Sequence, residues 1–221
     1  MQLSTEIVNP PAHSSSNSMA VFSNITAFED AQRMAKALIT SSLVPEEFKG
    51  PEKLGNAMIA LELANRIGAS PIAVMQNIHI IHGRPSWSAS FIIAALNSCG
   101  RFSPLRFTIE KSDKDTTCFA WAYDKTTNDI LEGPRVSISM AKEEGWIDKK
   151  GSKWRTMPEL MLRYRAAAFF GRLYAPDVLS GMSTADEAQD IKQEARASRV
   201  RDLTKIVLAE DKQETTNSEW E

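Results

Sequence analysis

The stretch Trp154–Tyr174, WRTMPELMLRYRAAAFFGRLY, decides how this chain folds. Thr156 and Glu159 have the spacing of a capping box, and Pro158 falls in the first turn, where a missing N–H is harmless, so the stretch is predicted to be a helix. Apolar residues cover nearly all of its surface, which is typical of a buried helix. Glu159 is its one acid, and its bases are Arg155, Arg163, Arg165 and Arg172.

Two of these arginines are expected to need an anion. Arg165 and Arg172 are seven residues apart and share one stripe of the helix, whereas Arg163 points the opposite way. A guanidinium at the edge of a core loses much of its solvation unless an anion replaces the water. That anion is either an acid of the same core, such as Glu62 or Glu110, or the phosphate of an external ligand, and the sequence leaves both open.

Length and composition set the protein class. The chain has 221 residues, of which 43% are hydrophobic, enough to build a core. No window approaches a membrane span, and the N-terminus has no basic stretch followed by an apolar run. Cys99 and Cys118 are too few for a disulfide framework. We therefore expect a cytoplasmic protein without a membrane partner.

Charge is unevenly distributed along the chain. The formal net charge is −2, but residues 149–175 hold a single acid, and residues 186–221 hold ten acids and six bases. A basic centre predicts an anionic partner, because local patches bind and averages do not. Trp154 adds an aromatic to the basic loop, a combination typical of single-strand binders. The bases of the centre are Lys149, Lys150, Lys153, Arg155, Arg163, Arg165 and Arg172.

The pattern of residues predicts an α+β fold. Three strand-like runs separated by polar turns indicate a small antiparallel three-stranded sheet, at residues 105–110, 116–123 and 130–138. A strand at 78–81 with a turn at 83–85 indicates a short hairpin. Helices are predicted at 27–40, with Thr26 and Glu29 as a capping box, and at 53–67, 89–98 and 140–144.

Three regions are expected along the chain. Residues 1–24 are rich in Ser, Asn and Pro and are predicted to be disordered. Residues 25–182 are predicted to form the DNA-binding core domain. Residues 183–221 are predicted to be a charged tail, helical and partly disordered.

The sequence offers no assembled catalytic or metal site. It has neither a glycine-rich phosphate loop for ATP nor an Asp/Glu cluster of the two-metal nuclease kind. His79 and His82 would face opposite sides of a strand, and no second cluster supplies further ligands. Cys99 lies in an apolar helix and is predicted to be a core residue. We expect neither an enzyme nor a bound metal or cofactor.

Four patches of the chain, in order, carry a resemblance. They are Phe48-Lys49-Gly50 followed by the helix from Ala60 to Gly68; Trp87-Ser88; Tyr123-Asp124-Lys125; and the run from Trp154 through Met161-Leu162-Arg163 to Arg172-Leu173, which continues to Asp186-Glu187-Ala188 and Ile191. Over roughly residues 47–191 the chain resembles the phage single-strand annealing recombinases of the RecT and Red-beta group.

This resemblance implies a fold, an activity and partners. The fold would be a small antiparallel sheet backed by helices, distantly similar to eukaryotic annealing proteins of the Rad52 type. The activity would be ATP-independent binding of single-stranded DNA and annealing to a duplex in phage recombination, in the cytoplasm of the bacterial host. The protein would act as a ring or helical homo-oligomer, beside a 5′→3′ exonuclease and the host single-strand-binding protein.

The resemblance also implies phosphate contacts at Lys49, Lys125, Arg163, Arg165 and Arg172. Two departures stand out: Glu159 occupies a place where the family commonly has a base, and the C-terminal tail is short. The alternatives are a passive protein that binds and protects single strands without pairing them, and a nuclease or other hydrolase.

Overall fold

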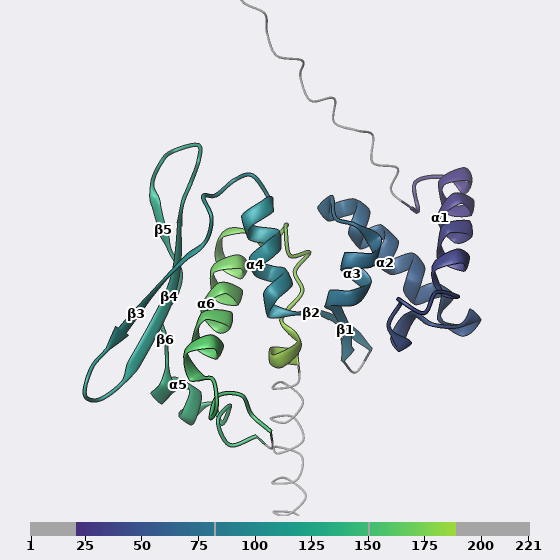
Figure 1. The fold of residues 1–221 in the computed structure, drawn as a ribbon. Coiled ribbons are helices and arrows are strands. Elements are labelled where there is room, and N and C mark those ends of the chain that lie inside the picture. The colour runs from purple at the N-terminus through teal and green to yellow at the C-terminus, as the bar shows by residue number, and fades with distance from the viewer. Residues whose placement is uncertain (1–20, 82, 150, 189–221) are drawn as a thin grey trace, which may run out of the picture. The chain divides into compact units, whose positions relative to one another are not determined.

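The computed structural model describes residues 21–81, 83–149 and 151–188 (Figure 1). The chain divides into two compact units, residues 1–76 and 77–221. Of the segment predicted to be disordered, Val21 is buried, and its N–H donates to a carboxylate oxygen of Glu62 at 2.8 Å. Residues 1–20 and 189–221 lie outside the described part.

The first unit is helical. Helix α1 buries Ala27, Ala31 and Ala35 against α2, and these small side chains let the two helices approach closely. Gly68 ends α2 with a φ of 67°, a left-handed conformation that favours glycine. The elements are α1 (Ile25–Leu38), η1 (Glu46–Phe48), η2 (Pro51–Lys53), α2 (Leu54–Ile67) and α3 (Pro71–Asn77). Among the described residues no lone helix has the length and apolarity to span a membrane; α2 and α3 pass only as a pair bent by 113°.

The second unit stacks a sheet, helix α6 and helix α4 in that order (Figure 1). The hairpin predicted near residue 80 is present, as β1 and β2 pair from Ile78 with Trp87 to Ile81 with Arg84. The elements are β1 (Ile78–Ile81), β2 (Arg84–Trp87), α4 (Ala89–Ser98), β3 (Arg106–Lys111), β4 (Thr116–Tyr123), β5 (Ile130–Glu132), β6 (Val136–Ser137), α5 (Ile138–Glu143) and α6 (Pro158–Tyr174).

The antiparallel sheet confirms the α+β prediction, with one difference in its third run. Strand β4 pairs with β3 on one edge and with both β5 and β6 on the other. The third run is broken between Glu132 and Val136, where three residues stand opposite two of β4, as in a bulge. Gly133 allows this, because a side chain there would lie 3.2 Å from both the Ala120 carbonyl and Cβ of Phe170.

Two predicted helix starts are wrong because another residue makes the capping contact, and a third predicted cap is absent. Asn24 accepts a hydrogen bond from the Ala27 N–H, so α1 begins at Ile25 and Thr26 is not its cap. Ser137 likewise caps α5 at the Met140 N–H, so this helix begins two residues before its predicted start. Helix α6 begins at Pro158 without a side-chain cap, so the predicted capping box of Thr156 and Glu159 is wrong; the Glu159 carboxylate lies 2.8 Å from Lys111 Nζ.

Candidate nucleic-acid interface

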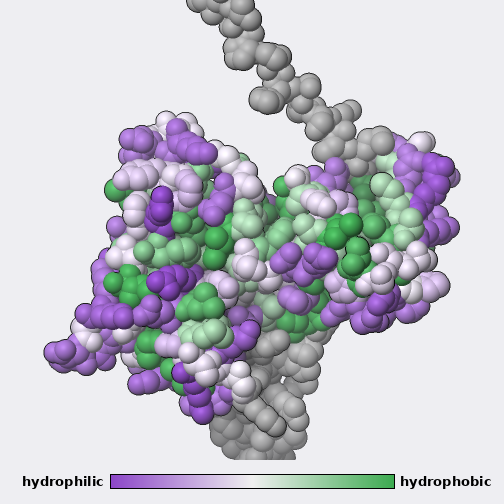
Figure 2. All heavy atoms as spheres, in the orientation of Figure 1, coloured by the Kyte–Doolittle hydropathy of each residue, from purple (hydrophilic) through white to green (hydrophobic). Residues whose placement is uncertain are grey.

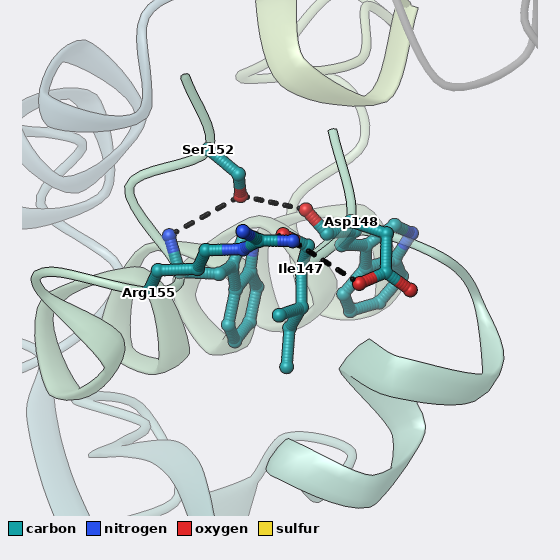
Figure 3. Close-up of polar contacts among 6 residues, drawn as sticks. Ile147, Asp148, Ser152 and Arg155 are labelled. Atoms are coloured by element: carbon teal, nitrogen blue, oxygen red, sulfur yellow. Dashed lines mark hydrogen bonds and ion pairs between the residues drawn. The ribbon is translucent and has the colours of Figure 1, made fainter. Parts of the chain in front are cut away.

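The basic loop between α5 and α6 is anchored by two buried tryptophans. The rings of Trp146 and Trp154 lie 5.4 Å apart, centroid to centroid. Ser152 joins the two: its hydroxyl donates to the Trp146 carbonyl at 2.6 Å and accepts from the Trp154 N–H at 3.3 Å (Figure 3). Trp154 is thus buried, and its indole completes a small aromatic core that lines one side of the loop.

Arg155 also contacts this loop through its side chain (Figure 3). Its Nε donates to the Ile147 carbonyl at 3.0 Å, and its Nη2 lies 3.4 Å from an Asp148 carboxylate oxygen. The side chain is mostly exposed and its ion pair is long, so Arg155 combines a structural contact with a charge at the surface.

A cavity of about 450 Å³ lies beside this loop. Its walls come from the loop, from β1, from the start of α4, from the first turns of α6 and from Ala185 and Asp186. Cations dominate its charged lining, because Lys149, Lys153 and Arg165 face one acid, Asp186. A cation-lined hollow of this kind suits an anion such as a phosphodiester.

Arg165 has its anion inside the protein. Its side chain is only 7% exposed, Nη1 lies 3.2 Å from a carboxylate oxygen of Glu187, and Cζ lies 3.9 Å from the centroid of the Trp146 ring. Burial lowers the pKa of Arg165 and Glu187 opposes that shift, but a guanidinium with these partners stays charged. Of the two anions considered for Arg165, an acid of the same protein or the phosphate of a ligand, the structure supplies the acid. It is Glu187, and neither Glu62 nor Glu110.

Arg172 shares the same carboxylate. Its Nη2 lies 2.6 Å from the same oxygen of Glu187, with 45% of the side chain exposed. Glu187 also accepts from the Thr184 N–H at 3.0 Å, while the Thr184 hydroxyl accepts from the Glu187 N–H. Thr184 and Glu187 therefore form a capping box, a signal that is readable in the sequence and was missed.

Arg163 lies on the sheet side of α6, as the opposite stripe predicted. Its Nη2 is 3.8 Å from a carboxylate oxygen of Glu159, which also pairs with Lys111 of β3. Lys111 first, and Arg163 to a smaller degree, hold the pKa of Glu159 below its usual value. Arg163 is therefore part of a surface ion-pair group distinct from the cavity.

Lys125 lies at the far end of α6 from the basic loop. The Lys125 N–H donates to the carbonyl of Arg101. The guanidinium of Arg101 in turn pairs with Asp177, just beyond the end of α6. The basic loop lies before the start of α6, whereas Asp177 lies beyond its end. The 17 residues of the helix span about 25 Å between the two. Lys49 belongs to the first unit, where Nζ lies 2.5 Å from Glu46. Lys150 falls outside the described residues.

In the described part of the chain, no three His, Cys, Asp or Glu side chains lie close enough together to hold a metal ion. His79 lines the cavity, and His82 lies outside the described residues.

Comparison with known proteins matches a segment that holds most of the cavity lining, although His79 and residues 88–90 lie before it. Residues 102–199, somewhat under half of the chain, match the model of the RecT family. The sheet, the basic loop and α6 all fall within this range, whereas the resembling patches before residue 102 lie outside it. No curated protein and no solved structure matches the chain.

Proposed function

Because residues 102–199 of this chain are a RecT-family segment, we propose that the protein binds single-stranded DNA and anneals complementary strands without ATP. The observation that carries the proposal is the cation-lined cavity, in which Lys149 and Lys153 flank the Ser152 anchor of the basic loop. Its biological setting would be homologous recombination of a phage, in the cytoplasm of the bacterial host.

Annealing requires strands that are held by their backbones while their base edges stay free. Lysine contacts to phosphate meet this need, because they gain affinity from counterion release and read no sequence. The burial of Trp146 and Trp154 supports this mode of binding, because the loop then presents charged side chains to the phosphates and no aromatic surface on which bases could stack.

The carboxylate of Glu187 changes the roles proposed for the arginines. Arg165 supports the cavity wall by packing on Trp146, and Arg172 shares Glu187. Lys149 and Lys153 take the main phosphate contacts in the proposal. Lys125, Lys150 and Arg155 are further candidates, and Lys49 would serve from the first unit.

Oligomerisation completes the proposed mechanism. One protomer with a few phosphate contacts binds weakly, whereas a row of protomers on one strand gains avidity without new contacts. A net charge of −2 lets protomers pack side by side with little repulsion. We propose a ring or helical homo-oligomer that works beside a 5′→3′ exonuclease and the host single-strand-binding protein.

The test compares the wild type with one double variant and one single variant. In Lys149→Ala/Lys153→Ala, affinity for a labelled oligonucleotide should fall, and the slope of log affinity against log salt should shrink by about 1.4, or 0.7 per lost contact. Lys142→Ala is the matched control, because Lys142 is exposed on α5 and outside the cavity lining. Fluorescence anisotropy across a salt series gives both quantities.

A second measurement separates annealing from passive binding. Two complementary oligonucleotides, each carrying one dye of a transfer pair, should pair faster with the wild-type protein than without it. Acceleration should be lost in the double variant and kept in Lys142→Ala. Tight binding without faster pairing would favour the passive single-strand-binding protein, and equal binding by all three proteins would refute the proposed site.

A further inference from the structure

The last described residues of the chain form part of the cavity wall. Ala185 and Asp186 line the cavity. Just before them, the carbonyl of Ser183 accepts a hydrogen bond from the N–H of Trp87 at 2.9 Å. The segment is thus attached where β2 leads into α4, whose first residues also line the cavity.

Glu187 fixes the same segment to α6. One of its carboxylate oxygens lies 3.2 Å from Nη1 of Arg165 and 2.6 Å from Nη2 of Arg172. The residues that follow Ala188 are therefore attached beside the cavity, in the same unit as the basic loop.

Residues 209–221 are strongly acidic, and we call them the acidic segment. They lie outside the described residues. Residues 189–208, which connect them to Ala188, hold five bases interspersed with three acids, whereas the acidic segment holds a single base, Lys212. Its five acids are Glu210, Asp211, Glu214, Glu219 and Glu221.

We propose that the acidic segment binds in the cation-lined cavity of the same chain and competes there with single-stranded DNA. Closely spaced carboxylates present a row of negative charges, as a phosphodiester backbone does. Lysines bind either one, because an ammonium acts as a point charge and demands no fixed geometry of its partner. The inference rests on the proposed function, since it assigns an internal competitor to the proposed DNA site.

Attachment to the same chain makes a weak contact effective. The 20 residues between Ala188 and the acidic segment span about 70 Å at most, and tethers of this kind give effective concentrations of about 1 mM. Such a competitor lowers DNA affinity about twofold if its own dissociation constant is about 1 mM, and about tenfold if that constant is about 0.1 mM.

The bases of residues 189–208 are the competing place for the acidic segment. They are interspersed with acids of their own, which offset part of their charge. In the cavity lining, by contrast, Lys149, Lys153 and Arg165 face Asp186 alone. The excess of positive charge therefore favours the cavity.

The first test neutralises the acidic segment in the full chain. Affinity for a labelled oligonucleotide at low salt should rise between about twofold and about tenfold. The gain should shrink as salt is added, because salt screens the contact between carboxylates and lysines. Unchanged affinity across the salt series would overturn the proposal. The variant is Glu210→Gln/Asp211→Asn/Glu214→Gln/Glu219→Gln/Glu221→Gln.

A matched variant controls for net charge. It removes five acids that are exposed and outside the cavity lining, and its affinity should stay close to that of the wild type. Both units carry hydrophilic side chains at the surface, which allows the change to be spread away from the cavity (Figure 2). An equal gain in both variants would reveal a general effect of charge and overturn the proposal. The control is Glu29→Gln/Glu47→Gln/Glu52→Gln/Asp113→Asn/Asp129→Asn.

The two lysines of the loop test where the acidic segment binds. Its neutralisation should raise affinity in the wild-type background and have little effect in Lys149→Ala/Lys153→Ala, because the shared site is then lost. The same gain in both backgrounds would locate the segment elsewhere, for example on the bases of residues 189–208, and would overturn the proposal.

A peptide gives a readout that needs no DNA. An isotope-labelled peptide of residues 209–221, followed by solution NMR, should bind the full chain whose own acidic segment is neutralised. Binding should be lost when Lys149→Ala/Lys153→Ala is added to that chain, and also when the five acids of the peptide are changed to amides. A peptide that does not bind, or that binds without these lysines, would overturn the proposal.

The outcomes separate this inference from the proposed function. If DNA affinity depends on Lys149 and Lys153 but neutralising the acidic segment changes nothing, the DNA site stands and the competition is refuted. If the peptide needs both lysines while DNA affinity does not, the cavity binds the acidic segment alone. The proposed DNA site then fails, and the competition fails with it.

Discussion

The guanidinium of Arg165 lies 3.9 Å above the indole of Trp146, in an environment where only 7% of the arginine side chain is exposed. This stack joins α6 to the basic loop. Glu187 completes it by neutralising the arginine from the segment that follows α6. The base that appeared best placed for DNA in the sequence thus holds together the wall against which Lys149 and Lys153 are positioned.

Substitution of Glu187 should destabilise the fold. Glu187→Ala leaves Arg165 buried without its carboxylate and should lower the free energy of unfolding by about 3 kcal/mol. Arg172→Ala should cost about 1 kcal/mol or less, because Arg172 is nearly half exposed and Arg165 keeps its partner. Urea denaturation of both variants measures the difference. Equal losses would show that Arg172 contributes as much as the buried pair.

The salt dependence of binding should distinguish lysines from arginines. Lys153→Ala should reduce the slope of log affinity against log salt by about 0.7, the value for one phosphate on a single strand. Arg172→Ala should leave the slope unchanged, because its guanidinium is held by Glu187 and Arg172 lies outside the cavity lining. If Arg172→Ala also reduces the slope by about 0.7, a phosphate displaces Glu187 from this guanidinium when DNA binds.

Asp115 should make the second unit sensitive to acid. Burial alone would raise its pKa, but hydrogen bonds from Ser139, Ser137 and the Thr116 N–H outweigh that effect and lower it from 3.8 to about 2. A carboxylate with a depressed pKa adds stability above its unfolded pKa, here about 3.8, and loses it as the pH falls to about 2.

Denaturation at several pH values checks this expectation. The stability of the wild type should fall between about pH 4 and pH 2, and Ser139→Ala should show a smaller fall, because the pKa of Asp115 then returns toward its ordinary value. An unchanged pH profile in Ser139→Ala would mean that other carboxylates cause the acid sensitivity.

Local patterns predicted most of the fold. The alternation of β4 and the polar turns that flank it gave the sheet, and the apolar surface of α6 correctly predicted its burial. The break after Glu132 was missed, because Val136 continues the same alternation and only the packing of Gly133 against Phe170 reveals the bulge.

The site was harder to predict because its decisive contacts are distant in sequence. Trp154 stood out as an aromatic within a basic loop, and its ring packs on Trp146 across a loop that Ser152 closes. Glu187 is 22 residues beyond Arg165, and no periodicity of α6 identifies it as the partner. Lys149 and Lys153, which the basic run predicted as DNA contacts, both line the cavity, and their contact with DNA stays a prediction.

The hydroxyl of Ser152 should control how well the two lysines bind. Ser152→Ala leaves the Trp146 carbonyl and the Trp154 N–H without this partner, which should cost about 1–2 kcal/mol and loosen the loop. Affinity for single-stranded DNA should then fall although both lysines remain, because a mobile loop must be ordered on binding. Ser152→Thr keeps the hydroxyl and should restore both stability and affinity. Binding by Ser152→Ala that equals the wild type, measured beside an impaired Lys153→Ala, would show that the lysines act without a fixed loop.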